Sequence, residues 1–276
     1  MILRFTKMNG AGNDFVVIDG VRAAINLSEA QIRKIADRHT GVGCDQVLIV
    51  EPPKRPDADF EYRIFNADGS RAGQCGNGAR CVGRFIHEQR LSANTTITLQ
   101  VGTELRKLAF DDSGNVKAEL GTPVFEPSKI PFTADNDEVE HALALNNVTV
   151  MAGVISMGNP HAVLLVDDVA ATPVEKIGPM IQALDVFPEG VNVGFMQVEN
   201  SATVSLRVFE RGAGETLACG SGACAAVVHG IRLGQLSNNV TVSVPGGKLE
   251  VSWDGSDGSV WLAGPAETVF EGKLTL

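Results

Sequence analysis

Two cysteines, Cys75 and Cys219, are the residues in this chain best suited to do chemistry. Each stands directly before a Gly-x-Gly-Ala sequence that is typical of a helix start. Unpaired backbone N–H groups at a helix start, together with the helix dipole, lower the pKa of a thiol from about 8.5 toward neutrality. We therefore predict that both thiols are reactive, and that the glycines allow a ligand to approach the backbone closely.

The two cysteines belong to a repeat that runs through the chain. At one constant offset Cys75 matches Cys219 and Phe65 matches Phe209, and the Cys-Gly-x-Gly-Ala sequence recurs. Several further matches follow in the same order, with small shifts of the kind that loops tolerate. The sequence therefore predicts a duplication that supplies one reactive thiol per copy to a shared cleft.

The elements that must position the cysteines are predicted in both copies. Each copy reads as strand, strand, helix, strand, strand, loop, buried helix and three strands. Ser28–Gln31 and Thr172–Glu175 are helix-start signatures, in which a hydroxyl N-cap is followed three residues later by Gln or Glu. The helices after the two cysteines are small or apolar on most sides, so each is expected to be enclosed by its own sheet.

The predicted fold class is therefore α/β (α+β), with two pseudo-symmetric duplicated domains. Each domain is expected to be a curved, β-barrel-like sheet wrapped around a central helix. A proline-containing crossover begins near residue 119, and Val124-Phe-Glu126 recurs in the tail as Val269-Phe-Glu271. We predict an N-terminal domain of residues 1–118 plus the tail 265–276, and a C-terminal domain of residues 119–264.

Composition limits the function classes. The 276 residues are 44% hydrophobic and 20% charged, as in a soluble globular protein. A net charge of −10 argues against nucleic-acid binding, which needs clustered Lys and Arg. No apolar run reaches the roughly 18–20 residues of a membrane helix. The first ten residues lack the apolar core of a signal peptide, which predicts a cytoplasmic protein without a membrane partner.

The remaining cysteines are expected to be structural. Five cysteines in a reducing compartment indicate free thiols, and Cys44, Cys81 and Cys224 have no counterpart in the repeat. We interpret these three as buried packing residues. The cysteine spacings do not fit a zinc or redox pair, so no metal site is expected. A dinucleotide-like match at Gly220-x-Gly222 follows a long loop instead of the tight turn such a site needs.

Two thiols on opposite sides of one carbon suit the inversion of a stereocentre. One thiolate removes a proton from one face while one thiol delivers a proton to the other, and the roles exchange in the reverse reaction. Two helix starts would bind the adjacent carboxylate, and their N–H donors would replace an electron-sink cofactor. No cofactor is therefore expected. These donors are predicted at Gly76, Asn77, Gly220 and Ser221.

Seven segments in chain order resemble the diaminopimelate epimerase family. They are Gly10-Ala-Gly-Asn-Asp-Phe15, Gly41-Val-Gly-Cys-Asp-Gln46, Phe65-Asn-Ala-Asp-Gly69, Cys75-Gly-Asn-Gly-Ala-Arg80, Gly158-Asn-Pro-His161, Glu210-Arg-Gly-Ala-Gly-Glu215 and Ala218-Cys-Gly-Ser-Gly-Ala223. The resemblance implies a cofactor-free enzyme that interconverts LL- and meso-2,6-diaminopimelate in lysine biosynthesis. It also implies a homodimer with a small-molecule substrate.

The resemblance assigns roles by position. Cys75 and Cys219 are the catalytic acid–base pair, and His161 and Glu210 tune the pKa values of the thiols. Arg211 is assigned to the distal carboxylate of the substrate. The substrate-binding set comprises Asn13, Gln46, Asn66, Gly76, Asn77, Asn159, Asn192, Glu210, Arg211, Gly220 and Ser221.

Two other functions fit part of the pattern. A proline or hydroxyproline racemase shares the two-thiol logic, although the asparagine-rich set suits a longer substrate with a second polar end. A carboxylate-binding or thiol redox protein without turnover would use the same helix starts. Proton exchange at the α-carbon of the ligand distinguishes an isomerase from such a binding protein.

Overall fold

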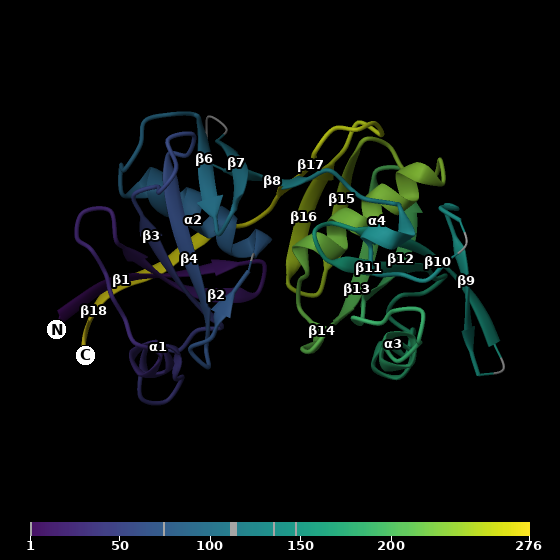
Figure 1. Ribbon diagram of the computed structural model, residues 1–276, viewed down its shortest axis with the longest axis horizontal. Helices are drawn as coiled ribbons and strands as arrows, with labels where there is room; N and C mark the ends of the chain where they lie inside the picture. Colours follow the sequence, from purple (N-terminus) through teal and green to yellow (C-terminus); the bar gives the residue numbers. More distant parts are fainter. Residues whose placement is uncertain (1, 74, 111–114, 135, 147) are drawn as a thin grey trace. The chain divides into compact units, whose positions relative to one another are not determined.

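The computed structural model describes residues 2–73, 75–110, 115–134, 136–146 and 148–276. The chain divides into Met1–Glu119 with Ala263–Leu276, here called unit 1, and Leu120–Leu262, here called unit 2 (Figure 1). Each unit is mostly sheet, which confirms the predicted mixed α/β class. The α-helices within the described residues are α1 (Glu29–Ala36), α2 (Gly76–Glu88), α3 (Val174–Gln182) and α4 (Gly220–Arg232).

Unit 1 is built on one run of paired strands. β18, β1 and β2 pair antiparallel, β2 pairs parallel with β3, β3 antiparallel with β4, and β4 parallel with β6. β6, β7 and β8 continue antiparallel, and the short β5 pairs with β4. The strands are β1 (Ile2–Gly10), β2 (Asn13–Asp19), β3 (Gln46–Glu51), β4 (Phe60–Asn66), β5 (Arg71–Ala72), β6 (Thr96–Val101), β7 (Glu104–Phe110), β8 (Val116–Gly121) and β18 (Glu267–Thr275).

Unit 2 repeats this order. β10 pairs antiparallel with β11, β11 parallel with β12, β12 antiparallel with β13, and β13 parallel with β15. β9 extends β10, β14 pairs with β13, and β16 with β15. The elements are η1 (Pro127–Lys129), β9 (His141–Leu145), β10 (Val148–Ser156), β11 (Pro160–Leu165), β12 (Asn192–Asn200), β13 (Thr203–Glu210), β14 (Gly214–Thr216), β15 (Asn239–Val244), β16 (Gly247–Ser252) and β17 (Val260–Ala263). The matching pattern confirms the duplication.

The helix that follows each cysteine is enclosed by the sheet of its own unit (Figure 1). α2 contacts β1, β2, β3, β7 and β18, and α4 contacts β10 to β13 and β16. Small residues allow this close approach. A Cβ on Gly83 would lie 2.8 Å from side-chain atoms of Leu108 and Val116. In α4, Ala223 and Ala226 are fully buried.

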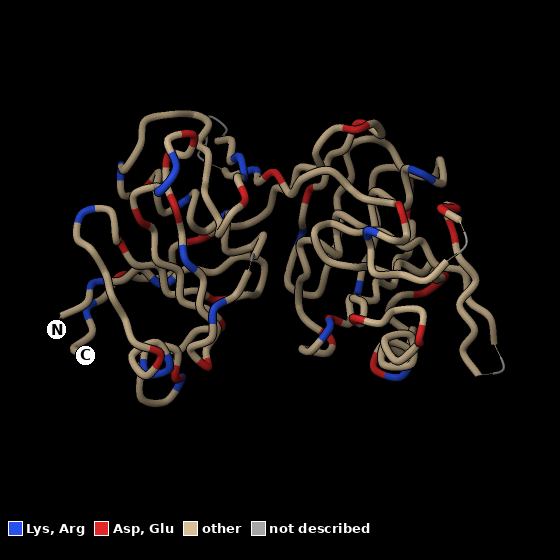
Figure 2. The backbone as a smooth tube through the Cα atoms, in the orientation of Figure 1, with Lys and Arg blue, Asp and Glu red and all other residues tan. Residues whose placement is uncertain are grey.

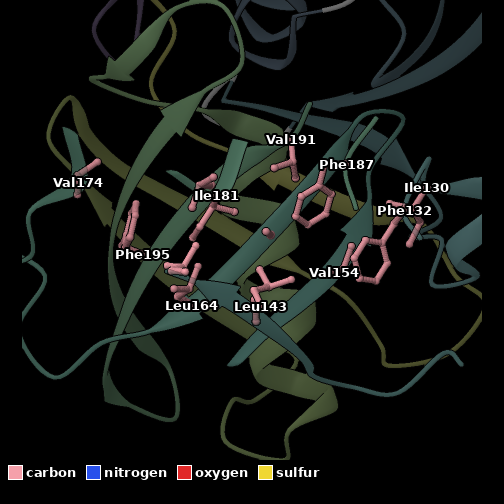
Figure 3. Packing of buried hydrophobic residues seen from close by; sticks show 14 of the residues in the cluster. Ile130, Phe132, Leu143, Val154, Leu164, Val174, Ile181, Phe187, Val191 and Phe195 are labelled. Atoms are coloured by element: carbon pink, nitrogen blue, oxygen red, sulfur yellow. The ribbon is translucent and has the colours of Figure 1, made fainter. Parts of the chain in front are cut away.

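The shorter helices α1 and α3 cover the opposite sheet faces. In unit 2, Ile181 of α3 packs with Leu164 and Phe195 of the sheet (Figure 3). In unit 1, Ile32 and Ile35 of α1 pack in the same way against β2 and β3. Because both faces of the sheet are buried at β2 and β3, these strands are apolar on both sides.

The helix-start predictions had different outcomes. Ser28 caps α1 in a capping box with Gln31, as the sequence predicted. For α3 the prediction was wrong, because Pro173 is the N-cap residue and no side chain caps the helix. The Thr172 hydroxyl instead donates to the Asp168 carbonyl at 2.6 Å. This bond holds Thr172 in the turn before the helix.

Charged residues of both signs are interspersed along each unit (Figure 2). The net charge of −10 is therefore not the result of one acidic segment. None of the helices in the described residues is long and apolar enough to cross a membrane.

Candidate active site

Strand direction brings three predicted residues of unit 1 to one sheet edge. Asn13 begins β2 and Gln46 begins β3, and parallel pairing places these two starts at the same edge. β4 runs the opposite way, so its last residue, Asn66, lies opposite Gln46. The Gln46 amide donates to Asn66 Oδ1 at 3.0 Å.

Cys75 is the N-cap residue of α2 and is half-buried. Its Sγ accepts a hydrogen bond from the Gly78 backbone N–H at 3.3 Å. A Cβ on Gly78 would lie 3.5 Å from this sulfur, so glycine leaves room beside it. Gly76 is the first residue of the helix. The sulfur therefore lies at a helix N-terminus, as expected for a thiol that is to carry negative charge.

Asn77 links the helix start to the strand edge. Its side chain is buried and donates to Asn13 Oδ1 at 2.6 Å. Its own Oδ1 accepts from Arg80 Nη2 at 2.8 Å. Arg80 was not among the site residues predicted from the sequence. Its place in the segment Cys75-Gly-Asn-Gly-Ala-Arg80, at the start of a helix predicted to be buried, was the available signal.

Unit 2 places its predicted residues in the same layout. His161 of β11 lies opposite Asn192 at the start of the parallel strand β12. Asn159, in the turn before β11, places its Oδ1 3.0 Å from His161 Nε2. The Asn192 amide donates to the Pro160 carbonyl at 3.0 Å, and Asn192 Oδ1 accepts from the Arg211 backbone N–H at 3.0 Å.

Cys219 has different surroundings from Cys75. Its Sγ donates to Glu210 Oε2 at 3.1 Å and lies 3.6 Å from Ser221 Oγ. Burial, followed by the charge and the hydrogen bond of Glu210, raises the pKa of Cys219 well above its usual value. The prediction of a lowered pKa was therefore wrong for Cys219. The hydroxyl of Ser221 and the Gly222 N–H, near Gly220 at the helix start, favour the thiolate, but the other effects outweigh them.

Thr216 is a second residue that the sequence analysis missed. Its hydroxyl donates to Glu210 Oε1 at 2.6 Å, while the other oxygen of Glu210 faces Cys219. The strand that carries Thr216 is held by the neighbouring Glu215, which forms a two-point ion pair with Arg207 at 2.6 and 2.8 Å. Two features of the sequence point to this support: Arg207 matches Arg63 in the repeat, and Glu215 ends the segment Glu210-Arg-Gly-Ala-Gly-Glu215.

Unlike Glu210 and Ser221, neither His161 nor Arg211 is in contact with the sulfur of Cys219 in the hydrogen bonds of the described residues. Burial, with a smaller effect from the Arg211 charge, lowers the pKa of His161 to about 3, so its ring is neutral at physiological pH. Within the described residues, no hydrogen bond joins His161 to Cys219. The exposed Arg211 donates from Nη1 to the Glu189 carbonyl at 2.6 Å.

The other cysteines are buried, as predicted. Cys44 is 2% exposed, and Cys81 and Cys224 are 0% exposed. Burial raises the pKa values of Cys44 and Cys81 to about 12, so both are thiols at neutral pH. Across the part of the chain that the structure describes, no group of three or more His, Cys, Asp or Glu side chains is arranged to hold a metal ion.

Each unit thus combines one thiol, one helix N-terminus and several amide groups. Backbone N–H groups at a helix start bind carboxylates, and side-chain amides can donate to further oxygen atoms. A thiol beside such a site can exchange a proton with a bound molecule. These features suit acid–base chemistry on a polar, carboxylate-bearing ligand.

Comparison with known proteins identifies relatives over the full length. The family model described as diaminopimelate epimerase matches residues 5–126 and 153–269. A diaminopimelate epimerase from Teredinibacter turnerae is 49% identical over 276 residues, covering 100% of both chains. One from Acinetobacter baumannii is 52% identical over 277 residues, covering 100% of this chain and 98% of the relative.

Solved structures share the fold at low identity. A hydroxyproline epimerase from Agrobacterium vitis has a TM-score of 0.70 at 14% identity, covering 99% of this chain and 92% of the other. A phenazine biosynthesis protein of the PhzF family from Bacillus anthracis has a TM-score of 0.69 at 15% identity, with 100% of both chains covered. At this identity the likeness concerns the fold alone. The full-length match to the family model and the relatives near 50% identity establish that this chain belongs to the diaminopimelate epimerase family.

Proposed function

We propose that this protein interconverts LL- and meso-2,6-diaminopimelate, with Cys75 and Cys219 as the acid and the base. The observation that carries the proposal is that each unit presents one thiol at the start of its enclosed helix. Family membership over the full length supports the substrate. The proposal requires both units to act on one substrate molecule, one from each face of its α-carbon.

The hydrogen bonds of the two sulfurs support a starting protonation state. Cys219 donates to Glu210 and has a raised pKa, so it begins as the thiol. Cys75 accepts from Gly78, which suits a thiolate. The Cys75 thiolate takes the α-proton as the C–H bond breaks, and the carbon takes the Cys219 proton on its other face. The enzyme is then left with Cys75 protonated and Cys219 ionised, ready for the reverse reaction.

The proposed substrate contacts follow from donor type. The carbanion is stabilised through its carboxylate, which accepts from N–H groups at Gly76, Asn77, Gly220 and Ser221. These donors do the work of an electron-sink cofactor, so the reaction needs none. The amide side chains hold the remaining polar groups, and Arg211 pairs with the distal carboxylate. Domain limits of 1–118 with 265–276, and 119–264, form part of the same proposal.

The decisive experiment is α-proton exchange of each diaminopimelate isomer in D₂O, with purified protein and no added cofactor. We expect deuterium to enter the α-carbon together with inversion. Cys75→Ala and Cys219→Ala should each reduce inversion by about 10²–10⁴-fold, the usual contribution of a positioned acid or base. Cys44→Ala, which removes a buried thiol outside the site, is the matched control.

Three results would contradict the proposal. Binding of diaminopimelate without exchange would indicate a non-catalytic binding protein. Near-normal inversion in either single cysteine variant would exclude the two-thiol mechanism. Preferential turnover of proline or hydroxyproline would favour the racemase alternative, to which the fold neighbours at 14–15% identity add no substrate evidence.

The proposal includes a cytoplasmic homodimer that takes a small-molecule substrate and no nucleic acid. Support for a second copy comes from large apolar side chains that remain exposed in β1 and β18. Ile2 is 71% exposed, Val269 58% and Phe270 47%. Light scattering after gel filtration should give twice the chain mass, and a monomer mass at working concentration would contradict the dimer.

A further inference from the structure

We infer that Arg80 is a positioning residue that sets the orientation of the Asn77 and Asn13 amides, so that both present N–H donors to the substrate. The inference rests on the proposed function, because it assigns these donors to a carboxylate-bearing substrate. Arg80 is 0% exposed and lies inside unit 1, one turn beyond the start of α2.

The orientation of Asn77 is determined by its arginine neighbour. Arg80 Nη2 lies 2.8 Å from the Asn77 side chain. A guanidinium group has donors and no acceptor, so the atom of Asn77 that faces it must be the oxygen. The amide nitrogen of Asn77 therefore points the other way, toward Asn13 at 2.6 Å.

The orientation of Asn13 is determined from both sides. Its Oδ1 must face the Asn77 nitrogen, because two amide nitrogens cannot form a hydrogen bond with each other. Its own nitrogen then lies 3.3 Å from Asp45 Oδ2. An ionised carboxylate only accepts hydrogen bonds. The chain Arg80–Asn77–Asn13–Asp45 thus runs from a donor-only group to an acceptor-only group, and every amide has one allowed orientation.

The orientation of the two amides determines which ligand groups the site can bind. Each amide nitrogen carries two hydrogens, and each hydrogen bond along the chain uses one of them. The second hydrogen of each can donate to a ligand oxygen, which a carboxylate supplies. Reversing either amide would turn a carbonyl oxygen toward that carboxylate and repel it. The buried positive charge of Arg80 also favours an anion nearby, because burial weakens solvent screening.

Packing around Asn77 limits other arrangements. A Cβ on Gly10, the last residue of β1, would lie 3.3 Å from the backbone carbonyl oxygen of Asn77 and 3.5 Å from the Asn77 Cβ. Glycine at this position therefore allows the strand to approach the helix start. Arg80 Nη1 also lies 3.4 Å from the Gly76 carbonyl. The guanidinium thus contacts both the backbone and the side chain at the start of α2.

Unit 2 has no equivalent cation at this position. The residue five positions after Cys219 is the buried Cys224, which has no guanidinium group. Its asparagine at the sheet edge, Asn192, is oriented by backbone groups of Pro160 and Arg211 instead. We therefore expect substitutions of Arg80 to affect the substrate groups held by unit 1.

Two substitutions of Arg80 provide the test. Arg80→Met keeps a long side chain but removes the donors and the charge, and Arg80→Lys keeps both. We expect Arg80→Met to raise the KM for diaminopimelate by about tenfold or more, as for a lost hydrogen bond to a charged group. Arg80→Lys should recover most of this loss. Both variants are compared at equal folded fraction, measured by circular dichroism.

Side-chain amide NMR gives a readout that does not depend on activity. In substrate-free protein labelled with ¹⁵N-asparagine, the Asn77 amide protons should exchange slowly with solvent. Arg80→Met should accelerate this exchange, whereas Arg80→Lys should retain most of the protection. A slow-exchanging Asn77 amide in folded Arg80→Met would overturn the inference. So would an unchanged KM, because it would show that Arg80 only supports packing.

A variant of Asp45, at the other end of the hydrogen-bonded series Arg80–Asn77–Asn13–Asp45, covers the case in which Arg80→Met does not fold. The Asp45 side chain is 41% exposed, so Asp45→Asn should fold. The substitution replaces the charged acceptor of the Asn13 amide with a neutral one. This weakens the hydrogen bond that holds Asn13, so KM should rise several-fold. Asp57→Asn, at another exposed ion pair of unit 1, is the matched control. Equal KM values in the two variants would contradict the inference, whereas failure of wild-type turnover would contradict the proposed function alone.

Discussion

At the scale of single residues, the two matched cysteines differ in the groups that contact their sulfur atoms. The sulfur of Cys75 accepts from a backbone N–H, and that of Cys219 donates to a carboxylate. An accepting sulfur is favoured as thiolate and a donating sulfur as thiol. Duplication therefore produced two similar helix starts, and at Cys219 burial together with the carboxylate of Glu210 favours the thiol.

Replacing Glu210 with glutamine should make Cys219 more reactive. Glu210→Gln removes the negative charge that, after burial, does most to raise the pKa of this thiol. The thiolate fraction at pH 7.5 should therefore increase, and iodoacetamide should alkylate Cys219 about tenfold faster. Peptide mass spectrometry at several pH values measures the rate. Glu199→Gln, an exposed change in the same unit, should have no effect, and an unchanged rate in Glu210→Gln would show that its charge does not control the thiol.

The sequence predicted part of the site because donors and thiols are recognisable by type. Cys75, Cys219 and Glu210 lie in motifs, and the repeat gave the cysteines equivalent positions. Thr216 could not be predicted in this way, because its contact with Glu210 depends on hairpin register. The β13–β14 pairing places Thr216 opposite Val208, two residues from Glu210 on the same face. No local pattern in the sequence specifies that diagonal contact.

At the scale of elements, small residues determine how closely helices and strands approach. The sequence predicted the enclosed helices correctly because α2 and α4 are rich in small and apolar residues. It did not predict which partner each glycine meets. In β10, a Cβ on Gly153 would lie 2.1 Å from Nδ1 of the buried His229 of α4. The His229 ring therefore occupies the space that a side chain at position 153 would need.

Adding one methyl group at Gly153 should destabilise unit 2. Gly153→Ala forces the His229 ring or the strand to move, and overpacking of this kind costs about 1–3 kcal/mol. Urea unfolding measures the loss. Gly194→Ala, where the new Cβ would meet its nearest atom at 3.5 Å, is the control and should be nearly neutral. His229→Ala should relieve the Gly153→Ala penalty in the double variant, and additive losses would contradict the proposed clash.

At the scale of the whole molecule, buried histidines should make the two units respond differently to acid. Burial, with a smaller effect from Arg232, lowers the pKa of His229 to about 4, and that of His161 is about 3. Both residues belong to unit 2. In the unfolded chain both should titrate at an ordinary histidine pKa near 6.5. Below that pH the unfolded state binds protons that the folded state does not.

Unit 2 should therefore lose stability as the pH falls from about 6.5 toward 4. Each histidine should contribute a loss on the order of 2 kcal/mol at pH 5, relative to neutral pH. Urea unfolding at pH 7 and pH 5 measures it, with the two units followed as separate transitions. His229→Phe should reduce the pH dependence, whereas His39→Gln at the exposed surface of unit 1 should not. An equal pH dependence in His229→Phe would contradict this assignment.

The pairing of β18 with β1 has a consequence for synthesis on the ribosome. β1 is made first, and its second neighbour in the sheet is made only after all of unit 2. At about 5–20 residues per second, residues 120–262 take roughly 7–30 s to translate. Throughout that interval the nascent β1 has an unpaired edge with exposed N–H and C=O groups, open to strands of other chains. Unit 2 can finish folding while unit 1 waits, so the first segment to emerge belongs to the last unit to be completed.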